Sequence, residues 1–237
     1  MPAAADRALV DKLVLANRIL YRYGVVDGFG HASVRHDRSV DHFLLARNMA
    51  PALVRREDIV TFDLDGAALD AAGRRVYLER FIHAEIYRAR PDVQAVVHSH
   101  SPNVIPFGVT GTPLQPVFHM SGFLADGSAL FEIREVAGDT DMLISNSGLG
   151  VALATALGSR STVLMRGHGS TVVGASIEQA VYRALYAEVN ARLQTQARQL
   201  GEVIYLNANE AAKAAAINDT QLPRVWELWV REVGAVE

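Results

Sequence analysis

Two histidines separated by one residue, His98 and His100, are the first feature of this sequence that points to chemistry. A buried-type strand is expected over residues 94–98, whose centre is apolar, and it runs directly into Ser99 and His100. Because alternate side chains of a strand face the same side, both imidazoles can reach one cation. Neutral imidazole suits several transition metals, so the pair indicates a divalent cation such as zinc, manganese, cobalt or iron. Since this spacing also arises often by chance, further ligands are needed.

A third histidine, His168, follows a second apolar segment and lies between Gly167 and Gly169. Small neighbours let the backbone turn tightly and leave space around the imidazole. Three protein ligands with positions left open are typical of a catalytic metal site, whereas a structural site is closed by four. The alternative, a histidine that only caps a strand end, is less favoured once Glu79 is considered. The three histidines are therefore predicted to hold the cation.

Glu79 opens a predicted helix, residues 79–90, that leads directly into the first histidine strand. The helix and the strand form one hairpin-like unit, so we expect Glu79 to lie near His98. It would then be a fourth ligand or an acid/base group beside the metal. From spacing alone, an ordinary glutamate at a helix N-terminus is the favoured interpretation. His83, one turn later on the same helix face, is expected to hydrogen-bond Glu79.

The composition of the whole chain limits the class of protein. It has 237 residues, half of them hydrophobic, and a formal net charge of −3. This length is ample for one buried core, so residues 1–237 are expected to form a single domain. The balanced charge without a long basic run argues against nucleic acid as a partner. With no cysteine present, any metal must be held by nitrogen and oxygen ligands.

The same sequence gives no sign of a membrane segment. Its first residues lack the apolar core of a signal peptide. No stretch approaches the roughly 18 apolar residues that are needed to span a bilayer. We therefore expect a cytoplasmic protein without a membrane partner.

The elements that must position these residues follow from the hydrophobic pattern. Helical spacing predicts helices over residues 8–23, 79–90, 176–200 and 221–232. Strands are expected in a segment that ends at Arg35 and over residues 42–46, 59–64, 94–98 and 162–166. This mixture predicts one α/β domain with a central sheet, although the order of the strands does not follow from it.

Residues 79–100 resemble the signature of the class II aldolase/adducin family. The glutamate, the Arg-Pro-Asp turn and the His-x-His pair stand in the family's order and spacing. Residues 163–169 resemble the segment that supplies the family's third histidine. The resemblance covers about residues 8–200 and implies an α/β/α sandwich around a mainly antiparallel sheet. It also implies a homotetramer with active sites at subunit interfaces, the three histidines as metal ligands and Glu79 as acid/base.

Two loops separate the branches of that family. The sugar-phosphate aldolases bind the substrate phosphate with a Gly-Asn-x-Ser loop and a second loop of small residues. This chain has His31, Ser33 and Arg35 in the first loop and Arg47 in the second. A phosphate site needs backbone N–H groups freed by small residues, whereas arginine matches a planar carboxylate. The substitutions resemble the branch of 3-hydroxy-2-methylpyridine-4,5-dicarboxylate and dihydroxyphthalate decarboxylases.

This resemblance implies a metal-dependent carbon–carbon lyase of aromatic catabolism, which removes CO2 from a hydroxylated aromatic or pyridine (di)carboxylate. The cation would stabilise the negative charge that CO2 leaves behind, and Glu79 or a water would return a proton to the ring. The expected substrate-binding residues are His31, Ser33, Arg35 and Arg47. The two arginines would bind a second carboxylate, and His31 the hydroxyl or a carboxylate. A structural or surface role explains His31 and both arginines equally well.

Three alternatives remain open. One is a class II aldolase that cleaves a sugar phosphate, which the altered loops disfavour. Another is a non-haem iron oxygenase that uses the same three histidines, because histidine binds iron(II) well. The least favoured is a non-enzymatic, adducin-like interaction module, since such members lack the intact metal set. The sequence identifies neither the aromatic acid nor the native metal.

Overall fold

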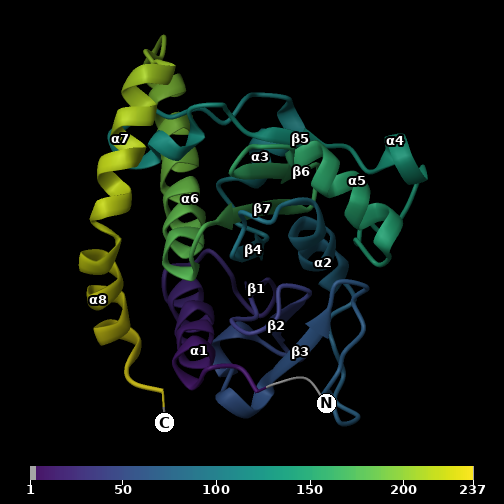
Figure 1. Cartoon of the computed structure of the whole chain (residues 1–237). Helices are drawn as coiled ribbons and strands as arrows, with labels where there is room; N and C mark the ends of the chain where they lie inside the picture. The colour runs from purple at the N-terminus through teal and green to yellow at the C-terminus, as the bar shows by residue number, and fades with distance from the viewer. Residues whose placement is uncertain (1–3, 237) are drawn as a thin grey trace.

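The computed structural model describes residues 4–236 of the chain (Figure 1). In this part the helices are α1 (Arg7–Arg22), α2 (Arg80–Ala89), α3 (Ile105–Thr110), α4 (Arg134–Ala137), α5 (Ser147–Leu157), α6 (Ile177–Leu200), α7 (Ala208–Thr220) and α8 (Leu222–Val233). The strands are β1 (His31–Arg35), β2 (His42–Ala46), β3 (Ile59–Asp63), β4 (Ala95–Ser99), β5 (Ala129–Phe131), β6 (Thr162–Met165) and β7 (Gly169–Gly174). Short 3-10 helices lie between them: η1 (Pro51–Leu53), η2 (Arg56–Asp58) and η3 (His119–Leu124).

Within residues 4–236 the strands form one seven-stranded sheet, in the order β3-β2-β1-β4-β7-β6-β5. Each neighbouring pair is antiparallel except β5 and β6, which run parallel. The mainly antiparallel central sheet expected from the sequence is therefore confirmed. β4, which carries the first histidine of the pair, lies between β1 and β7, so neighbouring strands hold it on both edges.

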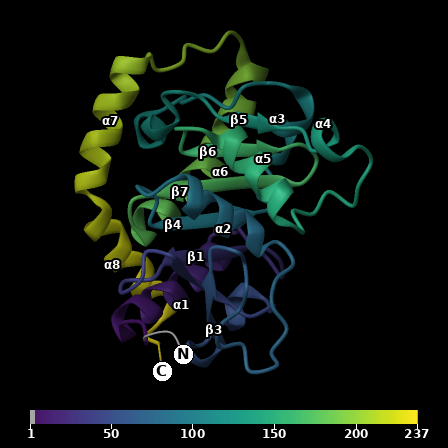
Figure 2. The same ribbon diagram turned by 45° about the vertical axis from the view of Figure 1, so that its right-hand side comes forward.

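Helices cover both faces of this sheet, as the sandwich prediction requires. α1, α6 and α8 lie over one face, and α2 and α5 lie over the other (Figures 1 and 2). Successive residues of β4 show the division, because Val96 is buried with the side chains of α2 and α5, and Val97 with those of α1 and α6. Apolar burial on both faces stabilises the fold and fixes which β4 side chains point to which layer.

Local residues set the ends of the main helices. The side chain of Asp6 accepts a hydrogen bond from the N–H of Ala8 at the start of α1, and Ser176 caps α6 in the same way. The helices predicted from the sequence correspond closely to α1, α2, α6 and α8. The predicted strands correspond to β1, β2, β3, β4 and β6.

Other elements were missed because their local pattern is weak. β7 begins and ends with glycine, a residue that is unfavourable in strands, so its sequence does not predict one. β5 has only three residues. α7 is rich in alanine and shows little difference between its faces. The sequence pattern also did not predict α3, α4 and α5. Tertiary contacts, rather than local periodicity, decide these segments.

The longest helix, α6, has 24 residues, and polar side chains interrupt its apolar ones throughout. Ala180, Val181 and Leu185 are among its residues buried against the sheet. In the described part of the chain, neither α6 nor any other helix is long and apolar enough to span a bilayer.

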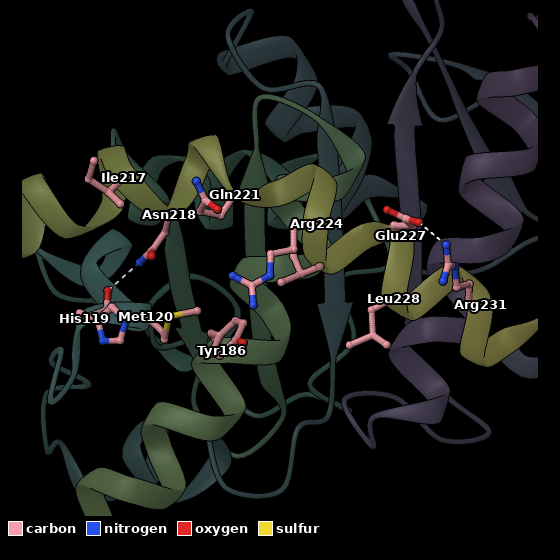
Figure 3. A pocket seen from close by; sticks show the side chains of 11 residues that line it. His119, Met120, Tyr186, Ile217, Asn218, Gln221, Arg224, Glu227, Leu228 and Arg231 are labelled. Carbon is pink, nitrogen blue, oxygen red and sulfur yellow. Dashed lines mark hydrogen bonds and ion pairs between the residues drawn. The ribbon is translucent and has the colours of Figure 1, made fainter.

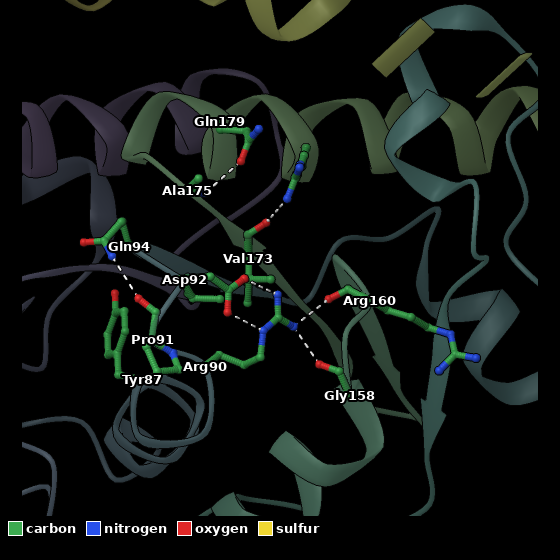
Figure 4. Close-up of polar contacts among 12 residues, drawn as sticks. Tyr87, Arg90, Pro91, Asp92, Gln94, Gly158, Arg160, Val173, Ala175 and Gln179 are labelled. Carbon is green, nitrogen blue, oxygen red and sulfur yellow. Dashed lines mark hydrogen bonds and ion pairs between the residues drawn. The ribbon is translucent and has the colours of Figure 1, made fainter. Parts of the chain in front are cut away.

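The Arg-Pro-Asp turn between α2 and β4 ties two parts of the chain together (Figure 4). Arg90 binds the carboxylate of Asp92 through two nitrogens, at 2.8 and 2.6 Å. Its third nitrogen donates to the carbonyl oxygens of Gly158 at 2.6 Å and Arg160 at 3.3 Å. The end of α2 is therefore fixed to the segment that connects α5 with β6.

Candidate metal and active site

Side chains from three separate parts of the chain converge at one end of β4. Glu79, His98, His100 and His168 each offer one ligand atom, and these atoms all lie within 4.8 Å of one another. Nε2 of His168 lies 3.0 Å from Nε2 of His100. Oε2 of Glu79 lies 3.5 Å from Nε2 of His98 and 3.6 Å from Nε2 of His168. We call these four residues the cluster.

The turn between β6 and β7 brings His168 to the two histidines of β4. β7 approaches β4 so closely that a Cβ on Gly169 would lie 2.0 Å from the carbonyl oxygen of Ser99. Gly167, on the other side of His168, has φ +65°, a left-handed conformation that favours glycine. The two glycines noted in the sequence therefore have separate physical roles, and both are needed to place this imidazole.

Glu79 is the N-cap residue of α2, but its side chain does not cap the helix. Instead, Oε1 accepts a hydrogen bond of 3.1 Å from the backbone N–H of Ile144. Because one carboxylate oxygen is held in this way, the other is directed at His98 and His168. The prediction that Glu79 lies near His98 is thus confirmed by the geometry.

Burial sets the charge of the cluster. It raises the pKa of Glu79 to about 7, an effect that the Ile144 N–H opposes and Asp141 reinforces. It lowers the pKa of His98 well below its ordinary value and that of His168 to about 4, with the neighbouring imidazoles adding to both shifts. These imidazoles are therefore neutral near pH 7, the form that binds a metal ion.

The cluster passes a physical test of its fit to a cation. Nε2 of His98 is buried and has no hydrogen-bond partner among residues 4–236. An orphaned buried nitrogen is unfavourable unless something binds its lone pair. Ligand atoms about 2.0–2.1 Å from a tetrahedral zinc ion lie about 3.3 Å from one another. Three pairs of the cluster, 3.0 to 3.6 Å apart, lie near this spacing, and all four ligand atoms lie within 4.8 Å of one another.

His31 is the one predicted substrate-binding residue that the structure brings against the cluster. It pairs with His98 across the β1–β4 ladder, and the two ring centroids are 5.1 Å apart. Tyr77 covers the same imidazole, with a centroid distance of 4.5 Å. Nδ1 of His31 contacts Nε2 of His83 at 2.7 Å.

Ser33 does not reach the cluster, because its hydroxyl forms hydrogen bonds between β1 and α2 instead. Its Oγ lies 2.6 Å from Nδ1 of His83 and 2.8 Å from the hydroxyl of Tyr87. The expectation that His83 hydrogen-bonds Glu79 is therefore wrong: the ring turns toward β1 instead. His83 and Tyr87 are residues whose part in the site the sequence analysis missed, and burial of a histidine on an apolar helix face was the available signal.

Arg35, which the sequence predicts to bind substrate, makes structural contacts in this structure. Four residues after His31, it lies about 13 Å farther along the strand. Its guanidinium donates to four backbone carbonyl groups, those of Val40, Tyr87, Arg90 and Val93. Through these contacts the guanidinium group of Arg35 joins β1 to the end of α2, away from the cluster.

Arg47 lies in a different hollow of the surface. Its Nε forms an ion pair of 2.6 Å with Asp58. Together with Met49 and Leu53 it lines an opening of about 490 Å³ that no member of the cluster lines. Tyr77 connects this region with the cluster, because its hydroxyl hydrogen-bonds the backbone of Met49 and its ring packs at a tilt against the imidazole of His31.

A larger hollow, of about 690 Å³, lies between α6, η3 and the C-terminal helices α7 and α8 (Figure 3). Tyr186, Arg224 and Leu228 are among the residues that line it. No member of the cluster does so, and we therefore place the candidate chemistry at the cluster rather than in this hollow.

Two residues mark the surroundings of the cluster. Phe29 is 69% exposed, and its ring centroid lies 6.3 Å from that of His100. Met142 adopts φ +70°, a strained conformation for a residue with a side chain, and its Cε lies close to Gly167. Strained residues of this kind gather at functional sites. An exposed aromatic ring and a strained loop thus flank the histidines.

Comparison with known proteins agrees with this site. Residues 11–195 match the family described as the Class II Aldolase and Adducin N-terminal domain. The chain belongs to this family. The decarboxylase tropJ of Talaromyces stipitatus is 38% identical over 91% of this chain and 90% of its own length. A 3,4-dihydroxyphthalate decarboxylase of Arthrobacter keyseri is 32% identical over 81% of this chain and 79% of its own.

The fold comparison leads to the same family. The solved structure of an L-fuculose 1-phosphate aldolase from Glaciozyma antarctica PI12 superposes with a TM-score of 0.78 and 27% identity, over 98% of this chain and 94% of that one. The class II aldolase-like fold is thereby confirmed. Family membership and the decarboxylase relatives together support an enzyme of the carbon–carbon lyase class.

Proposed function

We propose that this protein is a divalent-metal-dependent decarboxylase of a hydroxylated aromatic or pyridine (di)carboxylate. The observation that carries the proposal is the convergence of a buried carboxyl group, Glu79, with three neutral histidines. This constellation stands in a chain similar over nine-tenths of its length to a decarboxylase. We further propose that residues 1–237 act as one domain of the family.

In this proposal, Nε2 of His98, His100 and His168 would hold the cation, which is manganese, zinc, cobalt or iron. When bound, such a cation supplies a Lewis acid that stabilises negative charge developing on a substrate oxygen. The neutral state of the imidazoles and the orphaned nitrogen of His98 support these assignments.

Glu79 would act as the proton donor. With a pKa raised to about 7 in the metal-free protein, its carboxyl group is partly protonated near neutral pH. When the bond between the ring carbon and the carboxylate breaks, CO2 leaves and the electron pair stays on the ring. The ring carbon then takes the proton from Glu79, directly or through a water, and solvent restores it. The hydrogen bond from Ile144 keeps the donating oxygen directed into the cluster.

The substrate would be bound on the side of the cluster where His31 and Phe29 lie. Phe29 presents an exposed ring near His100 that suits stacking on an aromatic acid. Ser33 would act through His83 rather than on the substrate. Arg47 remains the proposed partner of a second carboxylate, and it would have to leave Asp58 to bind one.

A homotetramer with active sites at subunit interfaces is also part of this proposal. Membership of the class II aldolase and adducin family is its basis. A role in aromatic catabolism follows from the proposed substrate class. The cytoplasmic location expected from the sequence stays a prediction.

An aldolase acting on a sugar phosphate is the second candidate, favoured by the superposition on the fuculose 1-phosphate aldolase. Both reactions break a carbon–carbon bond and leave charge next to an oxygen, so the same cluster suits either. The bulky His31 in the first loop argues against the phosphate site that such a substrate needs.

The deciding experiment uses protein stripped of metal and reloaded with manganese, zinc, cobalt or iron(II). Each sample is incubated without oxygen with ortho-hydroxy aromatic dicarboxylates, including 3,4-dihydroxyphthalate, and in parallel with sugar phosphates. Metal-dependent release of CO2 would establish the decarboxylase and identify its metal. Turnover that begins only when oxygen is admitted to the same samples would support an iron oxygenase, and cleavage of a sugar phosphate alone would replace our proposal with an aldolase.

A further inference from the structure

A row of hydrogen bonds leads from the edge of the cluster into the layer between β1 and α2. Nδ1 of His31 contacts Nε2 of His83 at 2.7 Å, and Nδ1 of His83 contacts Oγ of Ser33 at 2.6 Å. The same Oγ lies 2.8 Å from the hydroxyl of Tyr87. All four side chains are buried, and none is more than 3% exposed. No member of this row belongs to the cluster, and the family comparison assigns it no role.

Only two arrangements of protons satisfy every contact in the row. The contact between Nδ1 of His31 and Nε2 of His83 requires one of these two nitrogens to be bare, and no carboxylate among residues 4–236 pairs with either buried ring. A charged ring would be uncompensated there, so each ring is neutral, with one N–H donor and one bare nitrogen. In the first arrangement, Tyr87 donates to Ser33, Ser33 to Nδ1 of His83, and Nε2–H of His83 to Nδ1 of His31. In the second, every bond is reversed, and the series of donors begins at Nδ1–H of His31.

The hydroxyl of Tyr87 distinguishes the two. Burial raises the pKa of this phenol well above its ordinary value, so it keeps its proton. The backbone N–H of Val96 donates to the phenol oxygen, so Oγ of Ser33 is the acceptor available to its proton among residues 4–236. In the second arrangement Ser33 donates to Tyr87, and the buried O–H of Tyr87 then has no acceptor. An unsatisfied buried donor is costly, whereas the only donor that the first arrangement leaves without a partner in the row is the Nε2–H of His31, and that atom is not fully enclosed.

The first arrangement places a proton on the far side of the ring of His31. Its Nδ1 accepts from His83, so Nε2 carries the hydrogen. Nε2 of His31 has no hydrogen-bond partner among the described residues. The atom is not fully enclosed, so a bound molecule can reach it. The ring itself packs against His98 of the cluster. The free N–H therefore lies where a molecule bound at the cluster can accept it.

We infer that His31 is held as its Nε2–H tautomer and donates this hydrogen to an anionic oxygen of the substrate, with His83 and Ser33 as positioning residues. The tautomer stands on the contacts of the row alone, whereas the substrate oxygen rests on the function proposed above. A carboxylate or a phenolate oxygen suits a neutral N–H donor. The opposite tautomer would present a lone pair and repel the same group.

The tautomer is measured by ¹⁵N NMR of histidine-labelled full-length protein without substrate, with zinc added and after chelation. We expect the proton on Nε2 of both His31 and His83 in both samples, because the row includes no cluster residue. The spectra of His31→Gln and His83→Gln assign the two sets of signals. A proton on Nδ1 of His31 in the wild type would overturn the inference.

The positioning role has its own test. Ser33→Ala removes the partner of His83 Nδ1 in either arrangement, so the two tautomers become similar in free energy and a second set of His31 signals is expected. Ser33→Thr keeps a hydroxyl and should restore the single set. Ser121→Ala is the matched control, because its buried hydroxyl contacts Phe118 and Asn190 instead. An unchanged single tautomer in Ser33→Ala would show that Ser33 does not position His31.

The donor role is tested on turnover of the aromatic acid once decarboxylation is established. We expect kcat/KM to fall on the order of 10²-fold in His31→Phe and clearly less in His31→Gln, whose amide N–H can donate. Equal losses in the two variants would overturn the donor role. If the wild type decarboxylates no aromatic acid, the proposed function fails, while the NMR measurement still decides the tautomer.

Discussion

His31 lies directly opposite His98 on neighbouring antiparallel strands, and their ring centroids are 5.1 Å apart. A shift of the β1–β4 ladder by one residue would turn His31 to the other face of the sheet. The next pair in the ladder, Ala32 and Val97, is buried under α1 and α6, and its packing holds the register. The core on one face therefore fixes the proposed substrate donor against the proposed metal ligand on the other.

Glu79→Gln separates a proton donor from a metal ligand. The amide has the size of the carboxyl group, and its oxygen can still accept the N–H of Ile144. We expect the metal content to stay unchanged while kcat falls about 10²-fold or more, the usual scale for a proton-transfer group. Elemental analysis and kcat are measured on the same preparation. Loss of the metal would instead make Glu79 a ligand.

His168→Ala tests the metal site itself. Removing one of three proposed nitrogen ligands should weaken binding of the cation by more than about 100-fold. Substitution of a residue that only hydrogen-bonds a metal ligand already lowers metal affinity by about 10- to 100-fold. Titration against a competing chelator measures this affinity. His119→Ala is the control, because that exposed histidine lines the hollow beside α8. The assignment of His168 fails if its variant binds the cation as tightly as the control does.

Gly169→Ala tests the close approach of β7 to β4. The new Cβ would lie 2.0 Å from the carbonyl oxygen of Ser99, so the backbone must move. We expect the free energy of unfolding to fall by about 2 kcal/mol or more, together with weaker metal binding at His168. Gly28→Ala, where nothing lies within 4 Å of the added Cβ, should stay within about 0.5 kcal/mol of wild type. Similar unfolding curves for both variants would contradict this account.

The stability of the metal-free protein should decrease as the pH falls from about 6.5. Burial lowers the pKa of His83 to about 3, whereas the unfolded chain takes up that proton near the ordinary value of 6.5. Between these two values the unfolded state binds more protons, so this residue lowers stability by up to about 1.4 kcal/mol per pH unit. Urea unfolding between pH 7 and pH 4.5 measures the slope.

The share of His83 in that slope is isolated by substitution. His83→Gln cannot take up the proton in the unfolded state, so its stability should depend less steeply on pH below 6.5. His119→Gln, at an exposed position, should keep the slope of the wild type. Equal slopes for the two variants would mean that other groups cause the acid sensitivity.

The sequence was sufficient for the cluster because its signals are local. His98 and His100 share a strand, glycines flank His168, and Glu79 begins the helix that leads into that strand. Each of these patterns spans a few residues. Their convergence was the further step, and the family resemblance supplied it. The helices and strands with strong periodicity were predicted for the same reason.

The partners of the remaining residues depend on contacts between distant parts of the chain. Ser33 and Arg35 looked like substrate ligands, yet α2 supplies His83 and several carbonyl groups that take up their polar atoms. The register between β1 and α2 decides this, and no local pattern reports it. Asp58 takes up Arg47 in the same way, from 11 residues away.

The anchoring of Arg90 has a consequence for motion. α2 has ten residues and is about 15 Å long, with Glu79 at its first end and Arg90 at its last. A helix moves as a stiff rod, so a displacement of Glu79 by more than a small amount must break the contacts of Arg90 or bend the rod. The carboxyl group is therefore preorganised before any substrate arrives.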